Sequence, residues 1–209
     1  MSSTEPAQRL TRKGQATRDR IVTTAARLMF ERGVAGTSTD DVQAVAGVSA
    51  SQLYHYFADK RSLTRAVIAA TIDAVLGGQM PLLGRLDSLD GLRAWSDAIV
   101  DLQRQRDHQG GCPIGSLVSE LADEWPEARA DLADGYARWE AAIRDGLRAM
   151  HARGELATGA DPDQLALATL AALQGGLLLT QARHDTVALE AVMDAMLEHI
   201  ASLVTPGSG

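Results

Sequence analysis

The chain has 209 residues, 45% of them hydrophobic, and carries a formal net charge of −7 with a single cysteine. These values suit one or two globular domains and exclude wholesale disorder, a disulfide framework and a four-cysteine zinc site. The polar N-terminal stretch lacks the apolar segment of a secretory signal, and the longest apolar run is shorter than a bilayer span. We therefore expect a cytoplasmic protein with no membrane partner.

The charge is unevenly distributed along the chain. Residues 1–65 hold ten Lys and Arg against six Asp and Glu, whereas the remaining residues hold ten against 21. A basic N-terminal part on an acidic body is expected when only that end meets phosphate. Chance clustering of charges on solvated surfaces explains the asymmetry equally well, so the interpretation depends on the motifs.

The first two predicted helices are amphipathic. The helix over residues 17–32 has one apolar face, formed by Ile21, Ala25, Leu28 and Met29. Ser38, followed three residues later by Asp41, has the capping-box pattern that starts a second helix. The buried face of this second helix is expected to contain Val42, Val45 and Ala46.

The connection to the third predicted helix has the pattern of a helix-turn-helix. Such a turn needs a small residue at the helix crossing, a glycine that can take positive φ and an apolar corner residue, and residues 46–48 (Ala-Gly-Val) supply them in order. Ser49 is expected to cap the third helix, with Leu53 and Phe57 facing the first helix. The outward residues are then Ala50, Ser51, Gln52, Tyr54 and His55. Small and polar side chains of this kind allow close approach to the major groove.

The rest of the chain also has helical periodicity, and no strand pattern competes with it. Further helices are expected over residues 59–75, 89–109, 114–121, 126–153, from Asp161 onward and over 187–204, with a loop at 77–84. We therefore predict an all-α fold with four parts. These are a flexible basic N-terminal arm (1–16), a three-helix helix-turn-helix domain (17–60), a helical ligand-binding and dimerisation domain (61–204) and a flexible tail (205–209).

Four short motifs follow one another at defined spacing within residues 36–63. They are AGVS at 46–49, LY at 53–54, the aromatic pair at 56–57, and Lys60 with Leu63 three residues on. In these motifs the segment resembles the DNA-binding region of the TetR/AcrR family of bacterial regulators, over about residues 17–70. The resemblance implies a dimeric transcriptional repressor released from its double-stranded DNA operator by a small-molecule effector. It implies no enzyme activity, cofactor or metal site.

The resemblance also implies which residues contact DNA. Phosphates would be bound by Ser38, Thr39, Tyr54 and Lys60, since helix N-termini attract anions. Base edges would be met by Ala50, Ser51, Gln52 and His55, and because the chain has no asparagine, amide reading of adenine in this helix depends on Gln52 alone. Asp40 stands where some members of the family use a basic residue, so that contact is expected to be missing. An N-terminal arm with Arg9, Arg12, Lys13 and Arg18 either reaches the DNA backbone or minor groove or is a solvated tail.

The segment 165–182 is apolar almost all round, which favours burial on every side. With the amphipathic final helix it is predicted to form half of an intermolecular four-helix bundle, in which Gly175 and Gly176 allow close approach. A purely intramolecular core is the alternative. The family resemblance favours the dimer, which places two recognition helices ~34 Å apart, one turn of DNA.

The effector is expected to bind among the central helices. Residues 111–115 (GCPIG) resemble one branch of the family, and the candidate pocket is lined by Trp95, Ile99, Leu102, His108, Cys112, Leu117, Trp125, Tyr136, Trp139, Ile143, Leu173 and Gln174. Each of these residues also fits an ordinary packed core.

Cys112 leaves two alternatives open. It could be a redox sensor, with Arg104, Arg106 and His108 nearby in sequence, or a nucleophile with His108 or His151 as base. A buried, inert cysteine is the commoner case. No phosphate-binding loop accompanies the enzyme alternative, and the histidines lack metal-ligand spacing.

Overall fold

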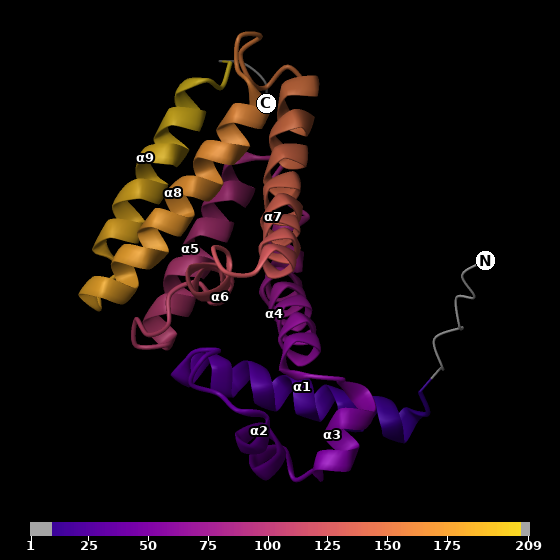
Figure 1. The fold of residues 1–209 in the computed structure, drawn as a ribbon. Coiled ribbons are helices and arrows are strands. Elements are labelled where there is room, and N and C mark those ends of the chain that lie inside the picture. Colours follow the sequence, from indigo (N-terminus) through magenta and orange to yellow (C-terminus); the bar gives the residue numbers. More distant parts are fainter. Residues whose placement is uncertain (1–9, 206–209) are drawn as a thin grey trace, which may run out of the picture. The chain divides into compact units, whose positions relative to one another are not determined.

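The computed structural model describes residues 10–205, and within this range the chain forms nine α-helices and no strand beyond one isolated bridge (Figure 1). The helices are α1 (Arg12–Arg32), α2 (Thr39–Ala46), α3 (Ala50–Tyr56), α4 (Lys60–Leu83), α5 (Leu89–Gln105), α6 (Pro113–Leu121), α7 (Pro126–Ala152), α8 (Pro162–Arg183) and α9 (Val187–Ser202). The predicted all-α fold is confirmed. The chain forms two compact units, unit 1 up to Ala70 and unit 2 from Thr71, so the division lies inside α4 and later than the expected boundary at residue 60.

Unit 1 contains α1, α2, α3 and the first part of α4, with α2 packed against both α1 and α3. The predicted apolar face of α1 is buried in full. Val42 and Ala46 of α2 are buried too, but Val45 is 50% exposed, which corrects the expected buried face. Positions 42 and 46 lie one turn apart on the side that packs, whereas position 45 points elsewhere on this short helix.

Helix α1 begins earlier than the sequence pattern indicates. Thr11 is its N-cap and its hydroxyl accepts the N–H of Gly14, so residues 12–16 are helical and not part of a flexible arm. The side chain of Gln15 donates to Asp19 one turn further on. Arg9 and the rest of residues 1–9 lie outside the described residues, as do 206–209.

Helix α4 continues through most of the predicted loop at 77–84 and ends at Leu83, despite Gly77, Gly78 and Pro81 within it. The Gln79 side chain explains part of this. Its amide NH2 donates to the carbonyl of Val75, and its Oε1 accepts the indole N–H of Trp95 at 2.8 Å. A tertiary contact of this kind overrides the weak helix propensity of glycine and proline.

In unit 2 the central helix α8 packs against α7 and α9, while α5 contacts α9 and α6 contacts α7 (Figure 1). The predicted start of α8 is confirmed, with Asp161 accepting two backbone N–H groups ahead of Pro162. A β-carbon on Gly176 would lie 2.9 Å from the Cα of Leu189, so this glycine sets the close approach of α8 and α9. The hydroxyl of Thr205 donates to the carbonyl of Gly154, which fixes the chain after α9 and corrects the expected start of a flexible tail.

Two helices in the described part of the chain, α4 and α8, are long and apolar enough to cross a membrane by length and composition. In α8, 44% of the apolar window is buried inside the protein. Core helices of soluble proteins have this composition as well, so the observation is weak evidence for a membrane span.

Candidate functional site

The α2–α3 connection has the predicted helix-turn-helix geometry. The Ser38 hydroxyl accepts the N–H of Asp41 at 3.1 Å, and the Asp41 carboxylate accepts the N–H of Ser38 at 2.9 Å, so the capping box of α2 is present. Gly47 ends α2 in the left-handed conformation at φ 62°, where a β-carbon would be strained. Val48 follows as the buried corner residue. The turn therefore forms for the reasons that the sequence indicates.

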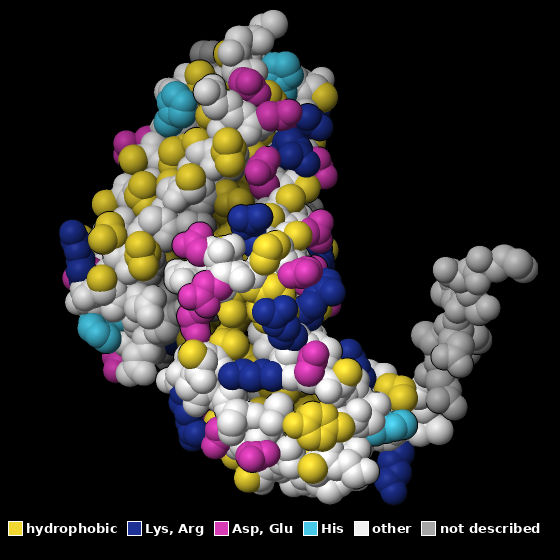
Figure 2. Space-filling model, in the orientation of Figure 1, with side chains coloured by type: hydrophobic (Ala, Val, Ile, Leu, Met, Phe, Trp, Pro, Cys, Tyr) yellow, Lys and Arg dark blue, Asp and Glu magenta, His cyan; other side chains and the backbone are white. Residues whose placement is uncertain are grey.

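Most side chains expected to contact DNA are accessible. The exposed ones are Ser38, Ala50, Ser51, Gln52, Tyr54 and His55, whereas Thr39 and Lys60 are half-buried. Leu53 and Phe57 point inward and are buried, as predicted. Figure 2 shows Lys and Arg side chains on the visible surface of unit 1. The structure thus leaves one face of α3 open, with small and polar side chains on it.

The side chain of Gln52, which was expected to point toward the bases, makes a hydrogen bond within α3. Its side-chain Oε1 accepts the backbone N–H of Ser49 at 3.0 Å, and the backbone N–H of Gln52 donates to the Ser49 hydroxyl at 3.2 Å. The pair is a second capping box, so the amide oxygen of Gln52 is engaged within α3. Bidentate reading of adenine needs both the oxygen and the NH2 group, so here the base would have to share the oxygen with the cap through its second lone pair.

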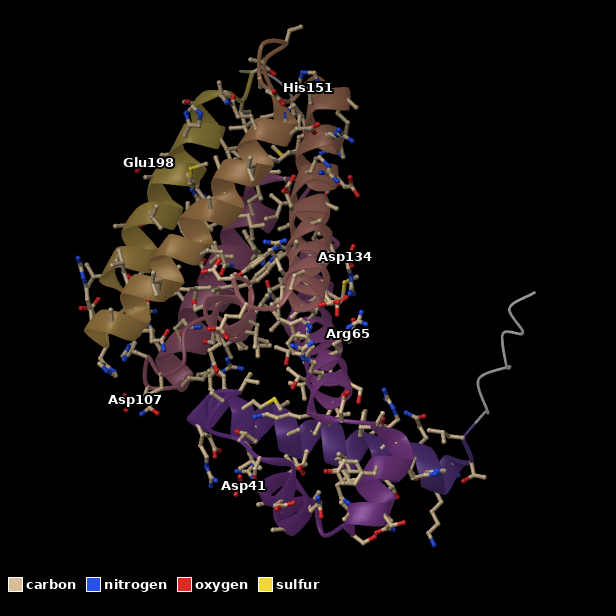
Figure 3. All side chains as sticks on the ribbon, in the orientation of Figure 1. Asp41, Arg65, Asp107, Asp134, His151 and Glu198 are labelled. Carbon is tan, nitrogen blue, oxygen red and sulfur yellow. The ribbon has the colours of Figure 1, made fainter. Side chains whose placement is uncertain are left out.

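Two carboxylates cap helices beside the expected phosphate contacts. Hydrogen bonds from the side chain and backbone of Ser38 hold the pKa of Asp41 below its usual value (Figure 3). Hydrogen bonds from the backbone and side chain of Ser62 lower the pKa of Asp59, which starts α4 next to Lys60. Since each pKa is lowered on folding, this stabilisation is present above the unfolded-state pKa and is lost as the pH falls through the folded one.

Arg18 lies in α1 and not in an extended arm. Its guanidinium stands 5.4 Å from the ring centre of Phe57, which is a cation–π contact between α1 and the residue after α3. His55 packs edge-on against Tyr56 with ring centres 4.9 Å apart. The ring of His55 is therefore exposed near the end of α3 and contacts Tyr56 on one side.

The residues expected to line an effector pocket fall into two groups in unit 2. The buried ones are Trp95, Ile99, Cys112, Leu117, Trp125, Trp139, Ile143 and Leu173. Tyr136, Gln174 and His108 are half-buried. Leu102 is 38% exposed on α5. This exposure disfavours Leu102 as a pocket-lining residue, because the inward side of its helix is occupied by Gln103.

Three of these residues meet at the junction of α6, α7 and α8. The Tyr136 hydroxyl donates to Oε1 of Gln174 at 3.1 Å, and both side chains also face the Cys112 thiol. Gly115 of α6 lies against the pair, since a β-carbon there would be 3.4 Å from the Tyr136 oxygen and 3.8 Å from Oε1 of Gln174. We call Cys112, Tyr136 and Gln174 the polar cluster of unit 2.

Burial raises the pKa of Cys112 above its usual value, so the side chain is a thiol and not a thiolate. A redox sensor or a catalytic nucleophile needs the opposite shift. The groups that act on the thiol are backbone N–H groups, Tyr136 and Gln174, and no histidine is among them. Neither alternative use of Cys112 is supported by this environment.

Sequence reasoning placed none of the polar side chains that lie in the interior of unit 2, and two of them have unpaired atoms. Gln103 of α5 is 3% exposed and Thr180 of α8 is fully buried. A glutamine or threonine inside a helical pattern is usually a surface residue, so composition gave no reason to place either one inside. Their only sequence signal is position, since Gln103 falls on the apolar side of the amphipathic α5 and Thr180 lies in α8, which is apolar almost all round.

A capped, exposed short helix after a left-handed glycine turn defines a helix-turn-helix DNA-binding protein. Family models agree with this class: residues 21–67 match "Bacterial regulatory proteins, tetR family", and residues 88–196 match "Tetracyclin repressor-like, C-terminal domain". The chain belongs to the tetR family and is a DNA-binding transcriptional regulator. Proteins of this family are generally not enzymes.

Curated relatives and solved structures support the assignment. The chain is 33% identical over 193 residues to an uncharacterised HTH-type transcriptional regulator of Mycobacterium tuberculosis, covering 85% of this chain and 91% of the relative. It is 30% identical over 152 residues to the transcriptional regulator AcuR of Cereibacter sphaeroides, covering 72% and 69%. A TetR transcriptional regulator from Chloroflexus aurantiacus matches in structure with a TM-score of 0.75 and 27% identity, covering 93% of this chain and 98% of that one.

Proposed function

We propose that this protein is a homodimeric repressor that binds a double-stranded DNA operator through unit 1 and leaves it when a small-molecule effector binds unit 2. The observation that carries the proposal is the open face of α3, which follows a capped helix-turn-helix. Repression with release by a ligand is typical of the family. A regulator of this kind works in the cytoplasm, where the DNA is.

Within the DNA interface, the proposed phosphate contacts are Ser38, Thr39, Tyr54 and Lys60. They stand at or near the starts of α2 and α4 or on the exposed side of α3, where N–H groups and hydroxyls bind anions. The proposed base contacts are Ala50, Ser51, Gln52 and His55, of which Gln52 has a free amide NH2 group and an oxygen that already accepts one bond in the cap. Unit 1 thus grips the backbone broadly and reads bases with few side chains.

The proposed dimer forms through α8 and α9. One side of α8 is exposed along its length and is apolar, namely Leu167, Ala168, Ala171, Gly175, Leu178, Leu179 and Ala182. Leu178 alone is 66% exposed. Contiguous apolar stripes of this kind mark protein interfaces, and a two-fold axis pairs the same stripe on both copies.

Effector release requires that the ligand bind the DNA-incompetent arrangement of the dimer more tightly than the competent one. Helix α4 is the proposed lever, because this single helix belongs to both units. The expected ligand site lies among α5, α6, α7 and α8 around the polar cluster.

Gel-shift assays with fragments of the DNA upstream of the gene, at low ionic strength, test the DNA-binding half of the proposal. We expect a discrete complex and a footprint with two half-sites about one helical turn apart, near 34 Å. Sedimentation of the free protein should give a dimer. A protein that binds none of these fragments, or that sediments as a monomer at micromolar concentration, contradicts the proposal.

A further inference from the structure

Several buried polar atoms of unit 2 have no hydrogen-bond partner. Among the described residues they include the indole N–H of Trp139, Nε2 of Gln174, Oε1 of Gln103 and Oγ1 of Thr180. Trp139 is 2% exposed, Gln103 3% and Thr180 fully buried. An unpaired buried donor or acceptor has lost its hydration without compensation, so native proteins rarely keep several in one core. Their presence indicates that something else completes this interior.

The polar cluster determines which atom of Gln174 is left unpaired. Because the Tyr136 hydroxyl donates to the amide oxygen, the NH2 group is the other end of this side chain, and it faces only the Cys112 thiol, a weak acceptor, with no geometric hydrogen bond. Trp139 lies three residues after Tyr136 on α7 and is buried on the same side of that helix. The unpaired atoms of Gln174 and Trp139 are thus both donors, and the two side chains come from the neighbouring helices α8 and α7.

The polar cluster and Trp139 carry no formal charge. Burial raises the pKa of Tyr136 as well as that of Cys112, so both stay neutral over the physiological range. The nearby buried side chains Trp95, Ile143 and Leu173 are apolar. Figure 3 shows side chains from α5 to α8 filling the space between these helices. On the same helix α7, Nε of Arg144 and Nε2 of His151 are also buried without a partner, but Arg144 pairs with Glu140 at 3.2 Å and neither side chain acts on Cys112 or Tyr136. A charged ligand at the polar cluster would therefore lose its hydration without gaining a counter-charge.

We infer that the effector is an uncharged, mainly apolar molecule with a carbonyl-type oxygen that accepts the free N–H of Gln174, with the indole N–H of Trp139 as a second donor. The inference rests on the proposed function, because it names the ligand class of the same effector site. The surplus acids of the chain do not take part in the cluster, so they give no reason to expect a cationic ligand there.

Matched probes test this ligand class without knowledge of the natural effector. Cyclohexanone and acetophenone supply a neutral acceptor, methylenecyclohexane and α-methylstyrene are their oxygen-free isosteres, and benzoate and benzylammonium carry a charge. Binding to the full-length dimer is measured by saturation-transfer NMR and titration at millimolar concentration. We expect at least one ketone to bind about tenfold more tightly than its isostere and than both ions, as for one buried hydrogen bond. Equal binding of ketone and isostere, preference for an ion, or no binding at all overturns the inference.

Variants locate the contact. Gln174→Met keeps the length of the side chain but removes the donor, and should reduce the ketone preference to about twofold or less. Gln164→Met, on an exposed glutamine at the start of the same helix, should leave the preference unchanged. Should Gln174→Met fail to fold, the ketone–isostere comparison on the wild-type protein still decides. A wild-type protein that binds operator DNA but no ketone refutes only this inference, whereas one that binds ketones but no DNA refutes the proposed repressor.

Discussion

The two units differ in how their polar side chains are satisfied. In unit 1 the pairs Ser38–Asp41, Ser49–Gln52 and Asp59–Ser62 are each three residues apart and close on themselves at helix starts. In unit 2, by contrast, lie all the buried side-chain polar atoms that lack a partner among the described residues. In the described part of unit 1, every buried side-chain polar atom has a partner within the chain, and the proposed DNA interface lies on the surface. Unit 2 has unpaired polar atoms in its interior, as expected if the proposed effector binds there.

We expect the largest effect from a substitution in the proposed dimer surface of unit 2. Leu178→Glu places a carboxylate in the exposed apolar stripe of α8 and should dissociate the dimer, because burying an unpaired charge costs several kcal/mol. Operator affinity should fall by about 100-fold, since one recognition helix no longer assists the other. Sedimentation and gel-shift titration measure both quantities. Leu102→Glu, on an exposed leucine of α5, is the control, and an equal loss for both variants would refute the assigned surface.

The adjacent glycines of α8 test the packing inside unit 2. Gly176→Ala pushes a β-carbon against the backbone of Leu189 and should lower the free energy of unfolding by about 2 kcal/mol. Gly175→Ala meets no atom within 4 Å in the same unit and should raise the stability of the helix by up to about 1 kcal/mol. Denaturant titration at one fixed protein concentration compares them. A stabilising Gly176→Ala would contradict the α8–α9 packing described above.

Gln52 tests whether the local pairing of unit 1 takes precedence over base reading. Gln52→Ala removes the capping contact and should weaken binding to all operator sequences by a similar factor, about three- to fivefold. Gln52→Glu keeps an acceptor for the Ser49 N–H and should preserve the helix while removing the amide donor. Binding to a set of operators with single base-pair changes separates the two roles. Loss of discrimination at one base pair in both variants would show that Gln52 reads that base.

The smallest effect is expected at Lys60, at the start of α4. Lys60→Ala should weaken binding across sequences and reduce the slope of log affinity against log salt by about one unit, because one phosphate contact is lost. Arg183→Ala, on an exposed arginine at the end of α8, provides the control and should leave the slope unchanged. A slope that does not change for Lys60→Ala removes this residue from the interface.

The predictability of the two units from sequence follows the same division. The capping box at Ser38, the cap at Ser49, the left-handed turn at Gly47 and the buried Leu53 depend on neighbours in sequence, and all were predicted. The hydrogen bond of the Gln52 oxygen to the Ser49 N–H was not predicted, because the sequence alone allows this side chain either to cap α3 or to point outward from it.

In unit 2 the determining contacts are distant in sequence. Gln79 reaches Trp95 across 16 positions and Tyr136 reaches Gln174 across 38, so periodicity gave the helices but not their partners. The continuation of α4 through Gly77, Gly78 and Pro81 was missed for the same reason. Local propensity favoured a loop there, and only a tertiary contact outweighs it.

The capping role of Gln52 has a consequence for how the regulator selects its targets in a genome. With the base contacts proposed above, which are mostly small side chains, α3 would form few directional bonds to bases, so each mismatched base pair would cost little. Much of the selectivity then comes from the ease with which a particular sequence adopts the required groove width and bend. We expect its binding sites to share a half-site spacing and a deformable centre more closely than they share a consensus sequence.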